Sequence, residues 1–242
     1  MASPRRFDLY AYIHKALRAQ MSHVLVEIGR TDWDDGAERD AGLAAVRDLL
    51  GLCHGHLEQE NTYIHPVLEL IRPRSSLLAD SDHKMQAAEI EALFDLCNAI
   101  DGGRPSSRAE AGEKLYRALS VFIADNFEHM AYEEREHNRL LWAAYGDDEI
   151  RAIHHVMVAS IPLEQSMRTL RWMVPNLTPQ ERTELLLGLR RTAPLDMFNA
   201  VMGMLRGLLK AGDWSKLTLA LSGLGPAPAA NDPGPDTRAV HA

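Results

Sequence analysis

A pair of ionisable residues stands inside an apolar helical stripe of this 242-residue chain. His129 and Glu133 lie one helical turn apart on the stripe that Leu115, Leu119 and Phe122 begin. Burying an imidazole and a carboxylate in an apolar core costs free energy unless something pairs with them. The fold must therefore bring partners for these two side chains into the interior.

Apolar residues recur with a helical period along most of the chain, which predicts an all-α fold. The expected helices span residues of about 8–29, 38–72, 76–101 and 107–143, followed by about 148–173, 178–191, 195–211 and 213–222. His56 and Glu60 repeat the His-x-x-x-Glu spacing on the apolar stripe of the second helix. His14 and His83 lie on the apolar faces of the first and third helices.

Breaks in this pattern divide the chain into three expected parts. Residues 1–146 hold four helices with short connections, which predicts an up-down-up-down four-helix bundle. Residues 147–222 are expected to be a C-terminal helical extension packed on the bundle, with a stabilising role favoured and a homodimer interface or a lid over the site left open. Over residues 223–242 the composition turns to Gly, Pro and Ala, which predicts a disordered tail.

Composition narrows the class of protein. A formal net charge of −8 without a basic stripe argues against nucleic acid or an anionic membrane as partner. Cys53 and Cys97 each lie inside a helical pattern without a CxxC motif, which predicts buried thiols in a reducing cytoplasm. No secretory h-region and no 18-residue apolar window are present, so the expected location is cytoplasmic.

The histidines and glutamates on the inward stripes form a weak internal repeat. In each half, a helix with a lone histidine precedes a helix with a His-x-x-x-Glu pair. Four imidazoles and two carboxylates in an apolar core suit two divalent cations such as iron, manganese or zinc, with each carboxylate bridging both. A zinc protease is excluded because His-Glu-x-x-His is absent. A Ser-His-Asp triad stays open, although no Gly-x-Ser-x-Gly elbow occurs.

Spacing alone is weak support for a metal site, because paired helical neighbours are common. Three further copies of the spacing occur at His23/Glu27, His54/Glu58 and His65/Glu69. At about 100° per residue, their histidines fall nearly opposite the faces of His14 and His56, which predicts solvated pairs. His137 is expected in a surface or capping role. Tyr10 and Tyr63 lie on the ligand side of their helices as packing residues or as hydrogen-bond partners of a ligand.

The order and spacing of four motifs carry a family resemblance over residues of about 8–145. The motifs are Ile13-His14-Lys-Ala-Leu-Arg18, His56-x-x-x-Glu60, Asp82-His83, and His129-x-x-x-Glu133 followed by Leu140-Leu141-Trp142. They resemble the hemerythrin-like, or HHE cation-binding, family. The resemblance implies two non-haem iron ions, bridged by an oxo or hydroxo group, that bind or react with oxygen, nitric oxide or peroxide. It places His14 and His56 on one iron and His83 and His129 on the other, with Glu60 and Glu133 bridging.

One departure from the family pattern bears on function. Oxygen-carrying members have a second histidine four residues after the one on the third helix, where this chain has Ala87. Four histidine bonds, four from bridging glutamates and two from a bridging oxygen fill ten of the twelve positions of two octahedral irons. Two open positions favour a reactive centre over a simple carrier, unless Tyr10, Tyr63 or His137 fills one. A sensing or iron-handling module without turnover is the alternative, so the sequence does not decide whether the protein is an enzyme.

Overall fold

The computed structural model describes residues 6–223, and all regular structure in that range is helical, as the sequence predicts. The chain divides into two compact units, the first ending at Asn176 and the second beginning at Leu177. The tail predicted over 223–242 lies, except for Gly223, outside the described residues. Among the helices of the described range, none is both long enough and apolar enough to span a membrane.

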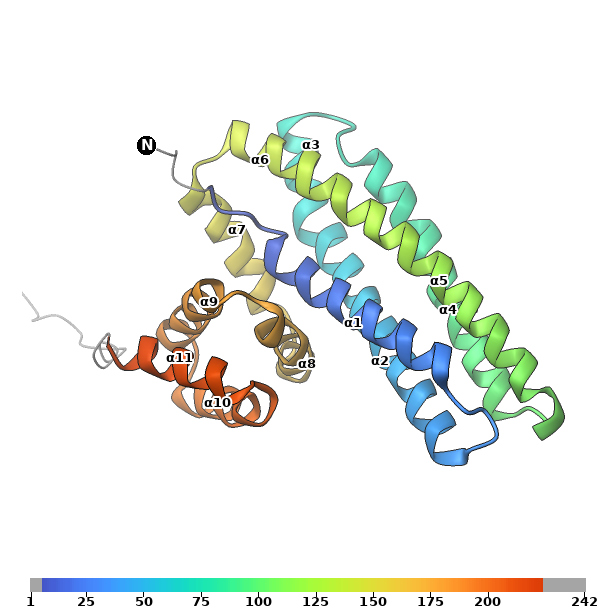
Figure 1. Cartoon of the computed structure of the whole chain (residues 1–242). Coiled ribbons are helices and arrows are strands. Elements are labelled where there is room, and N and C mark those ends of the chain that lie inside the picture. The colour runs from blue at the N-terminus through green and yellow to red at the C-terminus, as the bar shows by residue number, and fades with distance from the viewer. Residues whose placement is uncertain (1–5, 224–242) are drawn as a thin grey trace, which may run out of the picture. The chain divides into compact units, whose positions relative to one another are not determined.

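Long helical segments make up most of the first unit (Figure 1). They are α1 (Ala11–Arg30); α2 (Gly36–Gln59), continued by the π turn η1 (Glu60–Ile64) and α3 (His65–Ile71); α4 (Leu77–Asp101); and α5 (Arg108–Tyr132), continued by the π turn η3 (Glu133–His137) and α6 (Asn138–Ala144). A short 3-10 turn, η2 (Pro105–Ser107), precedes α5. Consecutive segments run in opposite directions, and α1 and α4 each pack against both α2 and α5 (Figure 1).

Local sequence explains where the second segment begins and where it changes its winding. The Asp35 carboxylate caps α2 by accepting hydrogen bonds from the backbone N–H groups of Ala37 and Glu38. Pro66 stands in the first turn of α3, directly after η1. Proline lacks a backbone N–H, so it is best tolerated where a regular hydrogen-bond ladder is already interrupted.

Two clusters of buried apolar side chains fill the first unit. They lie on either side of a layer of buried histidine and glutamate side chains, which we call the polar layer. The first cluster includes Leu17, Met21, Val46, Leu50, Leu57, Leu93, Leu119, Phe122 and Met130. The second consists of Leu9, Tyr10, Ile64, Leu68, Leu140, Leu141, Ile150 and Met157. Along the second segment, Leu57 belongs to the first cluster and Ile64 to the second, with Glu60 between them. Burial of each such leucine side chain contributes about 1.5–3 kcal/mol to the free energy of folding. The two clusters therefore hold the polar layer between them in place.

Two further helices, α7 (Asp147–Ala159) and α8 (Leu163–Met173), belong to the first unit, and the 3-10 turn η4 (Val174–Asn176) ends it. The single helix expected over 148–173 is interrupted, because Pro162 disfavours helix in the residue before it. Ile150 and Met157 of α7 complete the second cluster. The helix α8 packs on α1 and α2. A Cβ atom at Gly55 would lie only 2.1 Å from Nε2 of Gln165, so this glycine permits the close approach.

The second unit contains α9 (Pro179–Thr192), α10 (Leu195–Leu208) and α11 (Ala211–Ser222). Its buried side chains include Leu186, Val201, Leu205, Leu217 and Leu221. Thr178 and Glu181 form a reciprocal capping box at the start of α9. The stabilising, lid and dimer-interface roles considered for the C-terminal helices stay predictions.

Candidate metal centre

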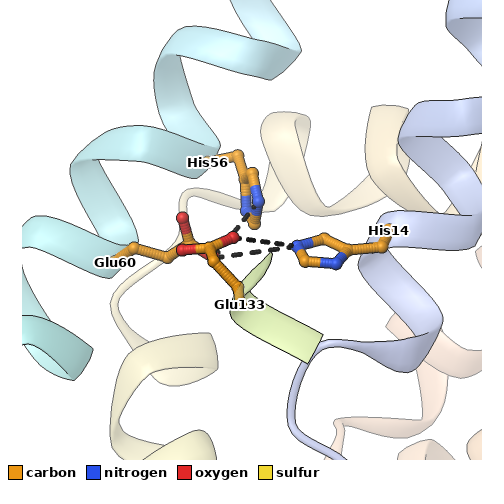
Figure 2. A group of neighbouring side chains, drawn as sticks. All are labelled: His14, His56, Glu60 and Glu133. Atoms are coloured by element: carbon orange, nitrogen blue, oxygen red, sulfur yellow. Dashed lines mark ion pairs between the residues drawn. The ribbon is translucent and has the colours of Figure 1, made fainter. Parts of the chain in front are cut away.

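The structure brings all six predicted site residues into the polar layer between the two apolar clusters. In one half, His14 Nε2 lies 3.5 Å from Glu133 Oε2 and 3.9 Å from Glu60 Oε1. His56 Nε2 lies 3.2 Å from the same Glu60 Oε1. Figure 2 shows these four side chains pointing toward one another; His14 comes from α1, His56 and Glu60 from α2 and its continuation η1, and Glu133 from η3.

The other half uses the same two carboxylates. His83 Nε2 lies 3.4 Å from Glu60 Oε2 and 3.9 Å from Glu133 Oε1. His129 Nε2 lies 3.4 Å from Glu133 Oε2. The Nε2 atoms of His83 and His129 are 2.9 Å apart.

The six side chains therefore form two interlocked donor groups that share Glu60 and Glu133. In each group, one donor atom from every residue lies within 4.8 Å of the others. Nitrogen and oxygen ligands of a divalent cation such as zinc sit about 2.0–2.2 Å from it, so two of them can be at most about 4.4 Å apart. Small side-chain movements would bring each group to that spacing.

Unsatisfied polar atoms show that the residues fit a cation. Buried atoms without a hydrogen-bond partner include Nε2 of His14 and His56 and both carboxylate oxygens of Glu60 and Glu133. Leaving a buried polar atom unpaired costs about 1–3 kcal/mol, and more for a charged group. Six such atoms in two adjoining donor groups match the chemistry of metal binding, which would supply the partners that they lack.

Three of the histidines have a partner on the ring nitrogen that faces away from the centre. His14 Nδ1 lies 3.0 Å from Glu134 Oε1, His83 Nδ1 lies 2.7 Å from Asn61 Oδ1, and His129 Nδ1 lies 3.2 Å from Asp82 Oδ2. An oxygen acceptor at Nδ1 favours the tautomer that carries its proton there and leaves Nε2 as a lone pair. The bare Nε2 atoms of His83 and His129 then face each other and need a cation or a proton between them.

The electrostatics of the layer favour a neutral arrangement when no metal is bound. Burial lowers the pKa of His14, but the nearby carboxylates of Glu133, Glu134 and Glu60 outweigh burial and raise the pKa to about 10. Burial also lowers the pKa of His129, and Glu133 outweighs it to give a pKa of about 9. Burial raises the pKa of Glu60 and Glu133, yet the surrounding histidines bring Glu60 to about 2 and Glu133 well below its ordinary value. Two protonated histidines thus balance two carboxylates.

The π turns place two more histidines in the interior than the sequence analysis expects. Backbone N–H groups of His65 and Asn138 donate to the carbonyls of Glu60 and Glu133, five residues back. Each wide turn advances the residues that follow it around the helix axis. His65 is therefore buried with 7% exposure rather than solvated beside Glu69, and His137 is completely buried rather than on the surface.

The other two additional His-x-x-x-Glu pairs, unlike His65 and Glu69, have exposed histidines. His54 and Glu58 form an exposed pair with 3.6 Å between Nδ1 and Oε2, as expected. His23 is exposed, as expected, but Glu27 binds Arg30 at 2.6 Å. The ring of His23 instead lies against Trp172, with 5.3 Å between ring centroids.

Sequence reasoning misses a buried amide on the third segment. Gln86 is 1% exposed, and both its side-chain Nε2 and Oε1 lack a hydrogen-bond partner in the described part of the chain. It stands directly before Ala87, which lies four residues after His83. The sequence does carry a signal for its burial: Gln86 lies three residues after His83 and therefore on the same face of the helix.

Comparisons with known proteins add no relative: no protein-family model, no curated protein and no solved structure matches this chain.

Proposed function

We propose that the first unit is a hemerythrin-like four-helix bundle that holds two non-haem iron ions. His14 and His56 would bind one ion, His83 and His129 the other, and Glu60 and Glu133 would bridge them. The observation that carries this proposal is the pair of interlocked donor groups, whose inward atoms are buried and, for His14, His56 and both glutamates, without partners. Imidazole and carboxylate donors suit iron, and they also accommodate manganese or zinc.

The function that this site supports best is to bind or react with a small ligand such as oxygen, nitric oxide or peroxide. Iron supplies the redox chemistry when it is bound. The chain supplies geometry, because carboxylate and amide partners orient three of the histidines. The flanking apolar clusters keep bulk water from the polar layer.

Anaerobic loading with Fe(II), followed by exposure to oxygen, nitric oxide or hydrogen peroxide, tests this proposal. Sustained consumption of peroxide or nitric oxide would support an enzyme. A stable, stoichiometric change in the optical spectrum would support a carrier or sensor, and loss of iron on reduction would support iron handling. His56→Ala is the matched loss-of-site variant and His54→Ala the exposed control. Ligand-dependent changes that are equal in these two variants would contradict the assignment.

A further inference from the structure

A second polar layer lies beside the candidate metal centre, on the side of the second apolar cluster. It consists of Tyr10, His65 and His137, and we call it the tyrosine layer. Tyr10 and His137 are completely buried, and His65 is 7% exposed. The His65 ring stacks on His83 with 4.8 Å between ring centroids, and the Tyr10 ring lies 5.2 Å from that of His14. The tyrosine layer is thus in contact with both donor groups.

The tyrosine layer has unused hydrogen-bonding capacity. Nε2 of His65 and Nε2 of His137 are buried and have no partner among the described residues. Both histidines stand at the end of a π turn, one that begins at Glu60 and one that begins at Glu133, and these turns direct them into the interior. Interrupting two helices to bury two unsatisfied imidazoles is destabilising on its own. Such π turns occur often at functional sites.

The surroundings of the Tyr10 hydroxyl favour one direction for its proton. Its hydroxyl oxygen lies 3.0 Å from Nδ1 of His137, and that Nδ1 lies 3.7 Å from Oε1 of Glu133. The negatively charged Glu133 oxygen near this ring nitrogen favours the tautomer with the proton on Nδ1 of His137, and the Tyr10 oxygen can accept that proton's hydrogen bond. His137 then donates to the Tyr10 oxygen, and the Tyr10 O–H can donate to another group.

We propose that the small ligand binds on the side of the metal centre that faces the tyrosine layer, where the Tyr10 hydroxyl donates a hydrogen bond to it. His137 acts as a positioning residue that orients Tyr10 without touching the ligand. This inference rests on the proposed function, because it requires metal in the site. It identifies the ligand as one with an acceptor atom, such as oxygen, peroxide or azide.

Azide binding to the iron-loaded protein tests the role of Tyr10. Metal content is measured first in the wild type, in Tyr10→Phe, in His137→Gln and in Tyr63→Phe. Tyr63 is the matched control, since it is a partly buried tyrosine of η1 that packs on the second cluster. An optical titration then gives the azide dissociation constant of each protein. Infrared spectra in H2O and D2O show whether the bound azide accepts a hydrogen bond.

We expect azide affinity to fall about 10-fold to 100-fold in Tyr10→Phe, which is the effect of losing one hydrogen bond to a charged acceptor. The solvent isotope shift of the azide stretch should disappear in Tyr10→Phe, decrease in His137→Gln and persist in Tyr63→Phe. A wild type that binds no metal would overturn the proposed function together with this inference. Full iron content in all variants with unchanged azide affinity and isotope shift in Tyr10→Phe would overturn the inference alone.

Discussion

Replacing Glu133 by glutamine removes the central carboxylate of the candidate site while keeping the shape of the side chain. In the metal-free protein, Glu133 lies within 3.5 Å of His14 Nε2 and 3.4 Å of His129 Nε2, and all three side chains are buried. The substitution leaves two protonated imidazoles without this partner. Breaking a buried ion pair by removing one partner costs about 3–5 kcal/mol.

The pKa of His14 gives an independent magnitude. Its rise from 6.5 to about 10 corresponds, at about 1.4 kcal/mol for each tenfold change in proton affinity, to about 4 kcal/mol of folding free energy at pH 7. Glu133 is the strongest of the three carboxylates that raise this pKa, so its loss removes the largest share of this contribution. The raised pKa of His129 adds a contribution of similar size. We therefore expect Glu133→Gln to lower the free energy of unfolding by about 3–5 kcal/mol at pH 7.

The pH dependence follows from the sign of the shifts. Both histidines have folded-state pKa values above their ordinary 6.5, so their contribution is fully present below pH 6.5 and is lost as the pH rises through about 9 and 10. The difference between wild type and Glu133→Gln should therefore shrink by more than half between pH 7 and pH 10.5. Urea unfolding of the metal-free protein, followed by circular dichroism, measures it.

Glu128→Gln provides the isosteric control, because Glu128 is exposed on α5, the helix that η3 continues. It should change the free energy of unfolding by no more than about 0.5 kcal/mol. A loss below about 1 kcal/mol in Glu133→Gln at pH 7, or an equal loss at both pH values, would refute the electrostatic reasoning.

Three further predictions concern the site and the packing around it. Metal binding at pH 7 should release about two protons, from His14 and His129, because imidazoles that bind a metal must be deprotonated. Calorimetry in buffers of different ionisation enthalpy counts the released protons. A measurement of no release would be inconsistent with the raised pKa values of the two histidines. Asp82→Asn should weaken metal binding about 10-fold to 100-fold by withdrawing the carboxylate from His129 Nδ1, and a competition titration with a chelator would expose an unchanged affinity. Gly112→Ala should lower the free energy of unfolding by about 1–3 kcal/mol, because the new Cβ would lie 2.2 Å from the Trp33 ring. Gly188→Ala is the control, since its Cβ would meet open space and should not destabilise the protein. Equal effects of the two substitutions in denaturant unfolding would contradict this packing.

The sequence predicts the helical elements and the residues of the polar layer because both follow from one periodicity. His14 and Glu60 fall on apolar stripes, and a regular α-helix preserves that facing along the segment. The break at Pro162 has a local signal as well, since proline disfavours helix in the residue before it. The helical period, the type of donor residue and the spacing were together sufficient to predict that the six donors lie in one layer.

The remainder depends on departures from regular geometry and on contacts between segments. The burial of His65 and His137 follows from wide turns that begin at Glu60 and Glu133, and no residue in those turns marks them in the sequence. The sequence pattern also does not predict the partners of the histidine Nδ1 atoms, which face away from the centre. Asp82 stands beside His83 in the chain, yet its carboxylate pairs with His129 on a different segment.

The most direct test of the central claim is the iron content of the folded chain. The protein is loaded with Fe(II) under anaerobic conditions, freed of unbound metal by gel filtration and assayed for iron and protein. The account predicts two irons per chain in the wild type and loss of iron in Glu60→Ala. A wild type that retains its helical circular dichroism but holds no iron, or a Glu60→Ala variant that still holds two, would contradict it.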